Sequence, residues 1–339
     1  MNKRNKNVTI VDIARELGVS TAMVSMVLSG KGPEHRISAK ASKKVLETAK
    51  KLGYKPNQMA RALRTGKSFI IGLLVADISN PFFSHIARLI ENEAGKYDYQ
   101  VMFASSDESL DKFQKLGDAF ISRQVDGIII VPVIDSQDVI AAWQSSGIPI
   151  VSIDRYFSSL NIPYAVTDNF EASFQMLEYI RKKGYNKIAF IGKESNLSNF
   201  NDREEGFKAC ANFFKLSPEQ FAVFRLDYFD WESEMKEVLQ KIVKESYDII
   251  FFGQNLLGIT GLKILNKSEV KIPDDIAIVS FDNPEVFEFN KPPITCIEQP
   301  LEDLAKEAVS RLLNIIESRS EETQECKRSK GRLIIRESC

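Results

Sequence analysis

From residue 68 onward, apolar runs of strand length alternate with segments in which apolar residues recur at helical spacing, such as 83–96, 109–123, 170–183 and 231–244. Such alternation predicts an α/β fold, in which parallel strands are covered by helices on both faces. Because the runs outnumber the strands of one comfortable open sheet, we expect two sheets. The predicted strands are 69–75, 100–104, 127–131, 148–153, 187–191, 222–226, 249–252 and 277–281.

Composition is that of an ordinary globular protein. Hydrophobic residues make up 44% and charged residues 27% of the 339 residues, which excludes disorder and collagen-like repeats. The longest apolar runs are far shorter than the roughly 20 residues of a transmembrane helix, and no apolar stretch typical of a signal peptide follows the basic N-terminus. We therefore expect a cytoplasmic protein without a membrane partner.

Cysteine and histidine are too few and too scattered for a metal site. The four cysteines include no CxxC pair and only two histidines are present, so no zinc pattern can be written. The glycine-rich loops GxxxxGKS/T and GxGxxG, which hold nucleotide phosphates, do not occur. We expect no metal and no cofactor.

Charge is divided unevenly along the chain. Residues 1–67 contain 15 Lys and Arg against 4 Asp and Glu, a charge of +11, whereas residues 68–339 contain 30 against 42, a charge of −12. This asymmetry predicts a basic module for a polyanion, joined to an acidic body that the polyanion repels. A solubilising charged tail is the alternative, but the basic segment is patterned for folding.

The first thirty residues predict two short helices joined by a tight turn. Thr9 precedes an apolar series and Asp12 follows three residues later, which is typical of a capped helix start. Gly18 ends this helix, since glycine readily adopts a left-handed turn conformation, and Ser20 is a favourable N-cap for the second helix. Two short helices with such a turn form a helix-turn-helix.

The first turn of the second helix in this motif faces base edges in the major groove. Here those positions hold Thr21, Ala22, Ser25 and Met26, whose methyl groups and thioether suit thymine methyl contacts, and an arginine to read guanine is missing. Packing of Met26 toward the core is the alternative, and it stays open. The predicted DNA contacts in this motif are Thr9, Ser20, Thr21, Ala22, Ser25 and Met26.

A third helix and a polar break complete the basic segment. Ser38 opens a helix with apolar residues on one face. Pro56 then breaks the chain, and Asn57 can cap a brief helix that is too short to be stable alone. Arg61 and Arg64 on that helix are spaced for contacts with phosphates or with the minor-groove floor.

Three stretches identify a family: VTIVDIARELGVSTAMVSMVLSG, then YKPNQMARALRTGKS, then the strand FIIGLLVADISNPFF directly after it. In these stretches, and as far as the last strand LIIRESC, the chain resembles the LacI/GalR family of bacterial transcription regulators. The resemblance implies a hinge helix at 59–64 that folds on DNA, with Leu63 inserted into the minor groove beside its partner-subunit copy. Unstacking a base step in this way costs about a few kcal/mol, which contact with the bent duplex offsets. A plain linker is the alternative.

The residues that follow the predicted strands are candidates for a ligand site, because ligands of open parallel sheets bind beyond the carboxyl ends of the strands. Acids, amides, arginines and aromatics recur there, and they suit a carbohydrate, whose hydroxyls need donors and acceptors and whose ring faces stack on aromatics. Any one of them is otherwise an ordinary turn residue. The segments are 77–83, 154–155, 195–203, 227–230, 254–255, 282–283 and 298–299.

The family resemblance narrows this set and implies two lobes, like those of periplasmic sugar-binding proteins. Arg155 stands where purine-sensing relatives carry an aromatic residue, which favours a sugar. Gln254-Asn255 replaces the Asn-Asp pair of many relatives, so the resemblance does not imply that this chain binds the same sugar as those relatives. The predicted ligand-binding residues are Asn80, Phe82, Phe83, Asp154, Arg155, Arg203, Phe229, Gln254, Phe281, Asp282 and Gln299.

These assignments predict four regions: a helix-turn-helix headpiece at 1–56, a hinge helix and linker at 57–67, an N-terminal lobe at 68–162 and 293–319, and a C-terminal lobe at 163–292 and 320–339. The protein is expected to be a homodimer whose two headpieces bind the halves of a pseudo-palindromic operator. We expect a nucleoid-associated repressor of carbohydrate genes, controlled by a sugar between the lobes. The resemblance leaves open whether the sugar releases DNA, and we favour release.

Two other classes of function fit the sequence less well. The basic headpiece would have no role in a free sugar-binding protein, and such a protein would carry a signal peptide. A glycosidase would use Asp154 or Asp77 with Asp282 as its carboxylate pair, but no spacing argument supports such a pair. The sequence therefore predicts a regulator and not an enzyme.

Overall fold

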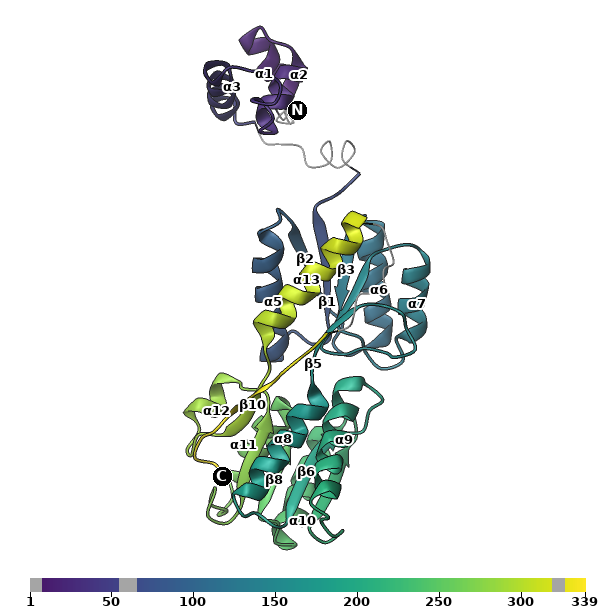
Figure 1. Ribbon diagram of the computed structural model, residues 1–339, viewed down its shortest axis with the longest axis vertical. Coiled ribbons are helices and arrows are strands. Elements are labelled where there is room, and N and C mark those ends of the chain that lie inside the picture. The colour runs from purple at the N-terminus through teal and green to yellow at the C-terminus, as the bar shows by residue number, and fades with distance from the viewer. Residues whose placement is uncertain (1–7, 55–65, 319–326) are drawn as a thin grey trace, which may run out of the picture. The chain divides into compact units, whose positions relative to one another are not determined.

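The computed structural model describes residues 8–54, 66–318 and 327–339. The chain divides between Ser68 and Phe69 into two compact units, and each is described by itself. The first contains the helices near the N-terminus, and the second contains two sheets with their helices (Figure 1). The predicted hinge residues Asn57, Arg61, Leu63 and Arg64 lie outside the described residues, so their roles stay predictions.

The first unit is a small helical domain. Its helices α1 (Ile10–Leu17), α2 (Thr21–Leu28) and α3 (Ala39–Lys51) pack around the buried side chains of Ile13, Ala14, Val24, Val27, Val45 and Ala49. Gly18 ends α1 with a φ of 63°, the left-handed conformation that the sequence predicts for this turn. The prediction of a helix-turn-helix is confirmed.

The second unit contains two six-stranded sheets whose strands follow in corresponding order. Their strand orders are β11-β5-β4-β3-β1-β2 and β12-β10-β9-β8-β6-β7, and the pairing of β10 with β12 is antiparallel whereas the other pairings are parallel. The first sheet consists of β1 (Ile70–Val75), β2 (Gln100–Ser105), β3 (Gly127–Ile130), β4 (Ile150–Ile153), β5 (Tyr164–Thr167) and β11 (Lys327–Ser329). The second consists of β6 (Ile188–Lys193), β7 (Phe221–Leu226), β8 (Ile249–Phe252), β9 (Ala277–Phe281), β10 (Thr295–Glu298) and β12 (Arg332–Ile334).

Helices cover the sheets and complete two lobes, which confirms the predicted α/β class. In the second sheet, consecutive residues of one strand, such as Ile249 and Ile250, point to opposite faces and belong to separate apolar clusters, so both faces of the sheet are covered. The first lobe comprises the first sheet with α5 (Pro81–Gly95), α6 (Leu110–Ser122), α7 (Gln137–Ser145) and α13 (Leu301–Ser318). The second lobe comprises the second sheet with α8 (Asn169–Lys182), α9 (Ser198–Phe213), α10 (Trp231–Lys244), α11 (Asn255–Leu265) and α12 (Glu285–Phe289).

In the described part of the chain, three segments cross between the lobes: the link from β5 to α8, the link from β10 to α13, and the link from β11 to β12 (Figure 1). The predicted lobe bounds are wrong at these crossings. The prediction ends the first part of the N-terminal lobe at residue 162, but β5 belongs to this lobe as well. It places 293–319 in the N-terminal lobe, but β10 pairs in the second lobe. It places 320–339 in the C-terminal lobe, but β11 pairs in the first lobe. These strands are short, and β11 is a polar edge strand, so none has a long apolar run.

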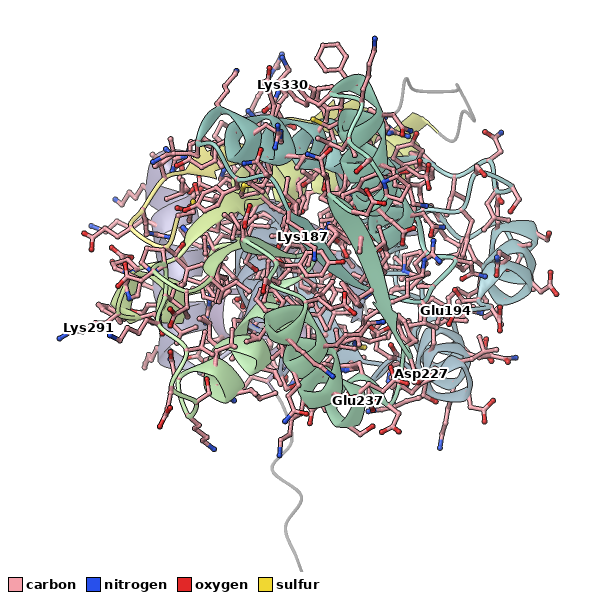
Figure 2. The ribbon with its side chains drawn as sticks, turned by 90° about the horizontal axis from the view of Figure 1, so that it is seen from below. Lys187, Glu194, Asp227, Glu237, Lys291 and Lys330 are labelled. Atoms are coloured by element: carbon pink, nitrogen blue, oxygen red, sulfur yellow. The ribbon has the colours of Figure 1, made fainter. Side chains whose placement is uncertain are left out.

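Helices of the described residues are all too short or too polar to cross a membrane. Charged side chains lie on the outside of the second unit, among them the exposed Glu237, Lys291 and Lys330 (Figure 2). Many of its apolar residues are instead buried in the cores of the two lobes.

Candidate functional site

The first turns of α2 present the predicted DNA-reading side chains at the surface. Thr21 and Ala22 are exposed and Ser25 and Met26 are half-buried, whereas Val24 on the same helix is buried. Met26 is therefore not a core residue. This helix offers methyl groups, hydroxyls and a thioether to an approaching partner.

Thr9 and Ser20, the two other predicted DNA contacts in the headpiece, begin helices. The hydroxyl of Thr9 donates to Asp12 at 2.7 Å, as does its backbone N–H at 2.9 Å. The hydroxyl oxygen of Ser20 accepts from the backbone N–H of Met23 at 3.2 Å. Both side chains thus fix the starts of α1 and α2, which sets how α2 is presented.

Buried polar side chains gather in the second unit, where the two lobes meet. Each comes from the carboxyl end of a strand or from a helix that begins there, as the rule for parallel sheets predicts. Asp154 and Asp282 directly follow β4 and β9, both with a left-handed backbone (φ 67° and 66°). Aspartate tolerates this conformation better than most residues. The buried polar set is Asn80, Asp154, Arg155, Asn169, Asn199, Arg203, Gln254, Asn255, Asp282 and Gln299.

Arg155 lies in the first lobe as a buried cation with a dedicated partner. Its guanidinium is 1% exposed and forms two parallel bonds to the Glu108 carboxylate, at 2.7 and 2.8 Å. It lies 5.7 Å from the ring centres of both Phe83 and Phe200. Burial alone disfavours the charge on Glu108, but Arg155 holds the pKa of that carboxyl below its usual range. Tyr228 of the second lobe also supports the ionised form of Glu108.

Burial makes the ionised form of Asp154 less favourable. Its Oδ2 accepts from Asn199 of the second lobe at 3.1 Å and lies 3.5 Å from Arg155 Nε. Desolvation raises the pKa of Asp154 to about 6, although Arg155 and Arg203 oppose that rise. The group therefore titrates near neutral pH, next to a contact between the lobes.

We predict that Asp154 makes stability fall as pH rises. Because its folded pKa of about 6 lies above its ordinary value of 3.8, the folded chain holds a proton that the unfolded chain has lost, and this stabilisation is lost as pH rises from about 4 through 6. Relative to Asp154→Asn, which stays neutral and tolerates the left-handed backbone, wild type should lose about 2.5 kcal/mol of unfolding free energy between pH 4 and 7.5.

The measurement is urea unfolding at both ends of this pH range, followed by tryptophan fluorescence. Asp274→Asn, at an exposed position before β9, is the matched control and should track wild type. A difference between wild type and Asp154→Asn that does not change with pH would contradict the assignment.

Arg203 on α9 is held entirely by the second lobe. Its Nε donates to Asn169 at 2.8 Å and one of its terminal nitrogens donates to the carbonyl of Gly253 at 2.9 Å. The guanidinium lies 3.8 Å from the centre of the Phe281 ring. Desolvation lowers the pKa of Arg203, although the carboxylates of Asp282, Asp154 and Asp202 oppose this. Phe281 is fully buried, so it supports Arg203 from beneath and presents no free face.

Asp282 and Gln299 form the centre of a second hydrogen-bonded group. The Asp282 carboxylate accepts from the backbone N–H of Asn255 at 3.1 Å and from Gln299 Nε2 at 2.6 Å. Gln299 Oε1 in turn accepts from the Thr167 hydroxyl at 2.6 Å. The Asn255 side chain donates across the lobes to Asn80 at 2.8 Å. Side-chain hydrogen bonds thus connect the two lobes beside this group.

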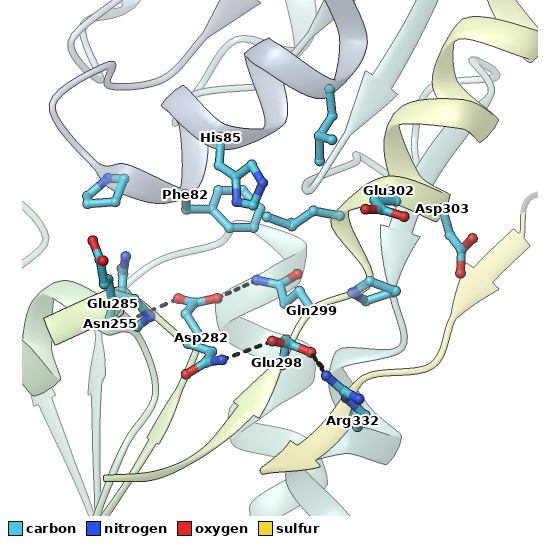
Figure 3. Close-up of a pocket in the computed structure, with 16 residues that line it drawn as sticks. Phe82, His85, Asn255, Asp282, Glu285, Glu298, Gln299, Glu302, Asp303 and Arg332 are labelled. Carbon is cyan, nitrogen blue, oxygen red and sulfur yellow. Dashed lines mark hydrogen bonds and ion pairs between the residues drawn. The ribbon is translucent and has the colours of Figure 1, made fainter. Parts of the chain in front are cut away.

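A cavity of about 630 Å³ opens beside this group, between α5 and α13 of the first lobe and the strand ends of the second (Figure 3). Phe82 and His85 face it from the first lobe, and Asp282, Asn255 and Gln299 face it from the second. Its volume lies in the range of small-molecule sites. The cavity combines an aromatic ring with carboxylate and amide groups, which is a set able to hold a polyhydroxylated molecule.

The structure brings most of the predicted ligand residues together, but not all. Asn80, Phe83, Asp154, Arg155, Arg203, Asp282 and Gln299 lie in the contacts described above, and Phe82 lines the cavity. Gln254 is buried beside them, and its Oε1 has no hydrogen-bond partner among the described residues. Phe229 is 71% exposed and packs against Tyr228 instead. Its place in the prediction is not supported by this geometry.

Several residues of the site are missing from the predicted set. Glu108 lies three residues after β2, so the strand-end rule used for the other loops identifies it as well. Asn199 falls in the candidate segment 195–203 without being singled out there, and Asn169, at the start of α8, has no sequence signal that separates it from an ordinary polar residue. Asn255 was named only as the neighbour of Gln254.

Comparison with known proteins agrees with this architecture. Residues 9–57 match the family described as bacterial regulatory proteins, lacI family, and residues 177–339 match a periplasmic binding protein-like domain. The ribose operon repressor of Halalkalibacterium halodurans is 31% identical over 333 residues, which cover 97% of this chain and 96% of that protein.

Solved structures share the fold. The lac repressor dimer bound to operator and the anti-inducer ONPF has a TM-score of 0.85 at 21% identity, and the match covers 98% of this chain and 99% of that one. A LacI-type regulator from Alkaliphilus metalliredigens, complexed with D-xylulofuranose, has a TM-score of 0.69 at 28% identity over 79% of this chain and 98% of that one. We conclude that the chain is a DNA-binding transcription regulator that belongs to the lacI family of bacterial regulatory proteins.

Proposed function

We propose that this regulator represses genes of carbohydrate use and that a small carbohydrate, bound between the lobes, controls its affinity for DNA. The observation that carries the proposal is the cavity where Phe82 of the first lobe faces Asp282, Asn255 and Gln299 of the second. Relatives named as ribose and sucrose operon repressors support a carbohydrate as the effector, as does the xylulofuranose complex of the related regulator.

The buried amide of Gln254, the residue before Asn255, does not line this cavity but is a second reason to expect a polar ligand near it. A buried acceptor without a partner costs about 1 to 3 kcal/mol, and Gln254 Oε1 is such an atom within the described chain. A hydroxyl group that donates to this oxygen would remove the cost. A ligand with several hydroxyls would also engage Asp282 and the neighbouring amides, because each hydroxyl both donates and accepts.

The proposed control operates through closure of the lobes. The Asn80–Asn255 and Asp154–Asn199 bonds cross between the lobes, so a ligand that competes with these bonds or adds to them would favour one arrangement of the lobes over another. A ligand shifts this equilibrium only by its difference in affinity for the two states. We propose that the sugar lowers operator affinity by about 5- to 150-fold, the usual range of such coupling.

The proposal includes assembly, location and the absence of catalysis. We propose a homodimer, since two-fold symmetry matches a pseudo-palindromic operator, acting in the cytoplasm at the nucleoid. The relatives are named as regulators, which supports a binding role for the carboxylates rather than a catalytic one. The hinge at 57–67 and its wedge Leu63 stay part of the proposal.

Calorimetric titration tests the ligand half of the proposal. The full chain is titrated with free aldoses, ketoses, uronic acids and their phosphates, and any sugar that binds is then added to the protein–operator complex. We expect one structural class to bind and to release the operator. A sugar that binds without changing operator affinity would contradict the proposed control, and silence across the panel would contradict a small carbohydrate as the ligand.

A further inference from the structure

The helix that would read DNA carries no charge. α2 has the sequence TAMVSMVL, with neither an acidic nor a basic residue in its eight positions. Val24 and Val27 face the core of the headpiece. At 100° per residue, Ala22, Ser25 and Met26 share the opposite side of the helix. The outward surface of α2 therefore consists of a methyl group, a hydroxyl and a thioether.

The positive charge of the headpiece lies on other elements. Arg15 is on α1, Lys31 and Arg36 are between α2 and α3, and a row of lysines is on α3, all of them exposed. The lysines of α3 are Lys40, Lys43, Lys44, Lys50 and Lys51. Groups that attract phosphates thus lie on other elements than the surface that would face the bases, and phosphate contacts carry no direct sequence information.

The chemistry of α2 limits which bases it can read. Guanine is read by arginine or lysine, adenine by asparagine or glutamine, and cytosine by aspartate or glutamate. None of these residues occurs on α2. What remains is apolar contact with the C5 methyl of thymine, for which alanine, threonine and methionine are suited, and hydroxyl contacts that discriminate weakly.

We propose that α2 reads its operator half-site through thymine methyl groups, contacted by Ala22 and Met26, and without a hydrogen bond to guanine. This inference rests on the proposed binding of operator DNA. The backbone of Met26 is fixed, because its carbonyl accepts from the Ser29 hydroxyl at 3.1 Å and from the Lys31 N–H at 2.9 Å. Its flexible side chain fits an apolar surface such as a methyl group.

The experiment begins by finding the operator. The full-length protein selects from a library of random duplexes, and the selected half-site is synthesised with each thymine replaced in turn by deoxyuridine. This change removes only the methyl group and keeps base pairing and the O4 acceptor. Losing one buried methyl contact should weaken binding about fourfold, and about 15-fold when the symmetric position in the other half-site is changed as well.

Two variants assign the contact to its side chain. In Met26→Ala, the ratio of affinities for thymine and deoxyuridine should fall to about one at the position that Met26 contacts. Met23→Ala is the matched control, since Met23 lies on the same helix but outside the outward face, and its ratio should equal that of wild type. The ratio compares two duplexes on one protein, so a general loss of folding does not change it.

A guanine analogue tests the other part of the proposal, that α2 makes no hydrogen bond to guanine. Replacing each guanine of the half-site by 7-deazaguanine removes the N7 acceptor, and we expect no change in affinity at positions facing α2. Loss of affinity there, or full affinity in every deoxyuridine duplex, would overturn the inference while leaving sequence-specific DNA binding intact. If the library yields no preferred sequence, the proposed operator binding itself fails, and the inference fails with it.

Discussion

Replacing Glu108 by alanine is expected to lower the free energy of unfolding by about 3 to 5 kcal/mol, the cost of removing one partner from a buried ion pair. The Arg155 guanidinium is 1% exposed, and it forms two bonds to this carboxylate, at 2.7 and 2.8 Å, and one to the carbonyl of Pro132 at 3.1 Å. Without Glu108 its nearest carboxylate is Asp154, 3.5 Å from Arg155 Nε, whose pKa burial has already raised to about 6. The cation would remain buried with a weak partner.

Urea unfolding followed by tryptophan fluorescence measures this effect, because Trp143 and Trp231, the two tryptophans of the chain, both lie in the second unit. The matched control is Glu91→Ala, which removes the carboxylate of an exposed pair with Arg88 at 2.8 Å and should cost less than about 1 kcal/mol. Replacing Glu108 and Arg155 together by methionine should recover most of the loss. A single Glu108→Ala variant as stable as the control would contradict the buried pair.

Replacing Asp282 by alanine is expected to weaken binding of the effector by about 100-fold or more. Hydrogen bonds to a charged group contribute about 1.5 to 3 kcal/mol each, and Asp282 both faces the cavity and orients Gln299 and Asn255. Operator binding without effector should be retained, because the headpiece is a separate compact unit. The measurement is calorimetric titration with the sugar that binds wild type, together with operator release.

Two control variants show whether the loss of effector binding comes from the Asp282 carboxylate. Alanine is strained at the φ of 66° that Asp282 adopts, whereas asparagine tolerates it, so Asp282→Asn removes the charge without backbone strain and should also lose the effector. Asp274→Ala, at an exposed position, should bind as wild type does. Undiminished binding by Asp282→Asn would show that the effector does not use this carboxylate.

Much of the fold is predictable because long apolar runs leave few alternatives. The eight predicted strands all occur, with bounds that differ by at most two residues. The strands that were not predicted are short, as in Tyr164–Thr167, or polar, as in Lys327–Ser329, where an edge position requires no apolar pattern. Such strands form because the neighbouring strand offers free backbone groups, which is tertiary information.

The candidate site likewise contains residues that can be predicted from the sequence and residues that cannot. Residues that directly follow strands, such as Asp154 and Asp282, are found from sequence because parallel topology brings strand ends together. Asn199, which bonds to Asp154, comes from the first turn of a helix, and its role depends on how the lobes close. Phe229 satisfies the same rule as Asp282 but is exposed, since the rule places a residue at the edge of the sheet without fixing where its side chain points.

The three crossings between the lobes limit how a new specificity can evolve. Each lobe is assembled from separate stretches of chain, so a single exchange of DNA between two related genes cannot transfer one intact lobe. A hybrid formed in this way would join strands of different parents within one sheet, where their packing has never been matched. A headpiece, by contrast, is one continuous stretch and can be exchanged whole. Recombination is therefore expected to change the operator readily, while the effector changes by point substitutions at the strand ends.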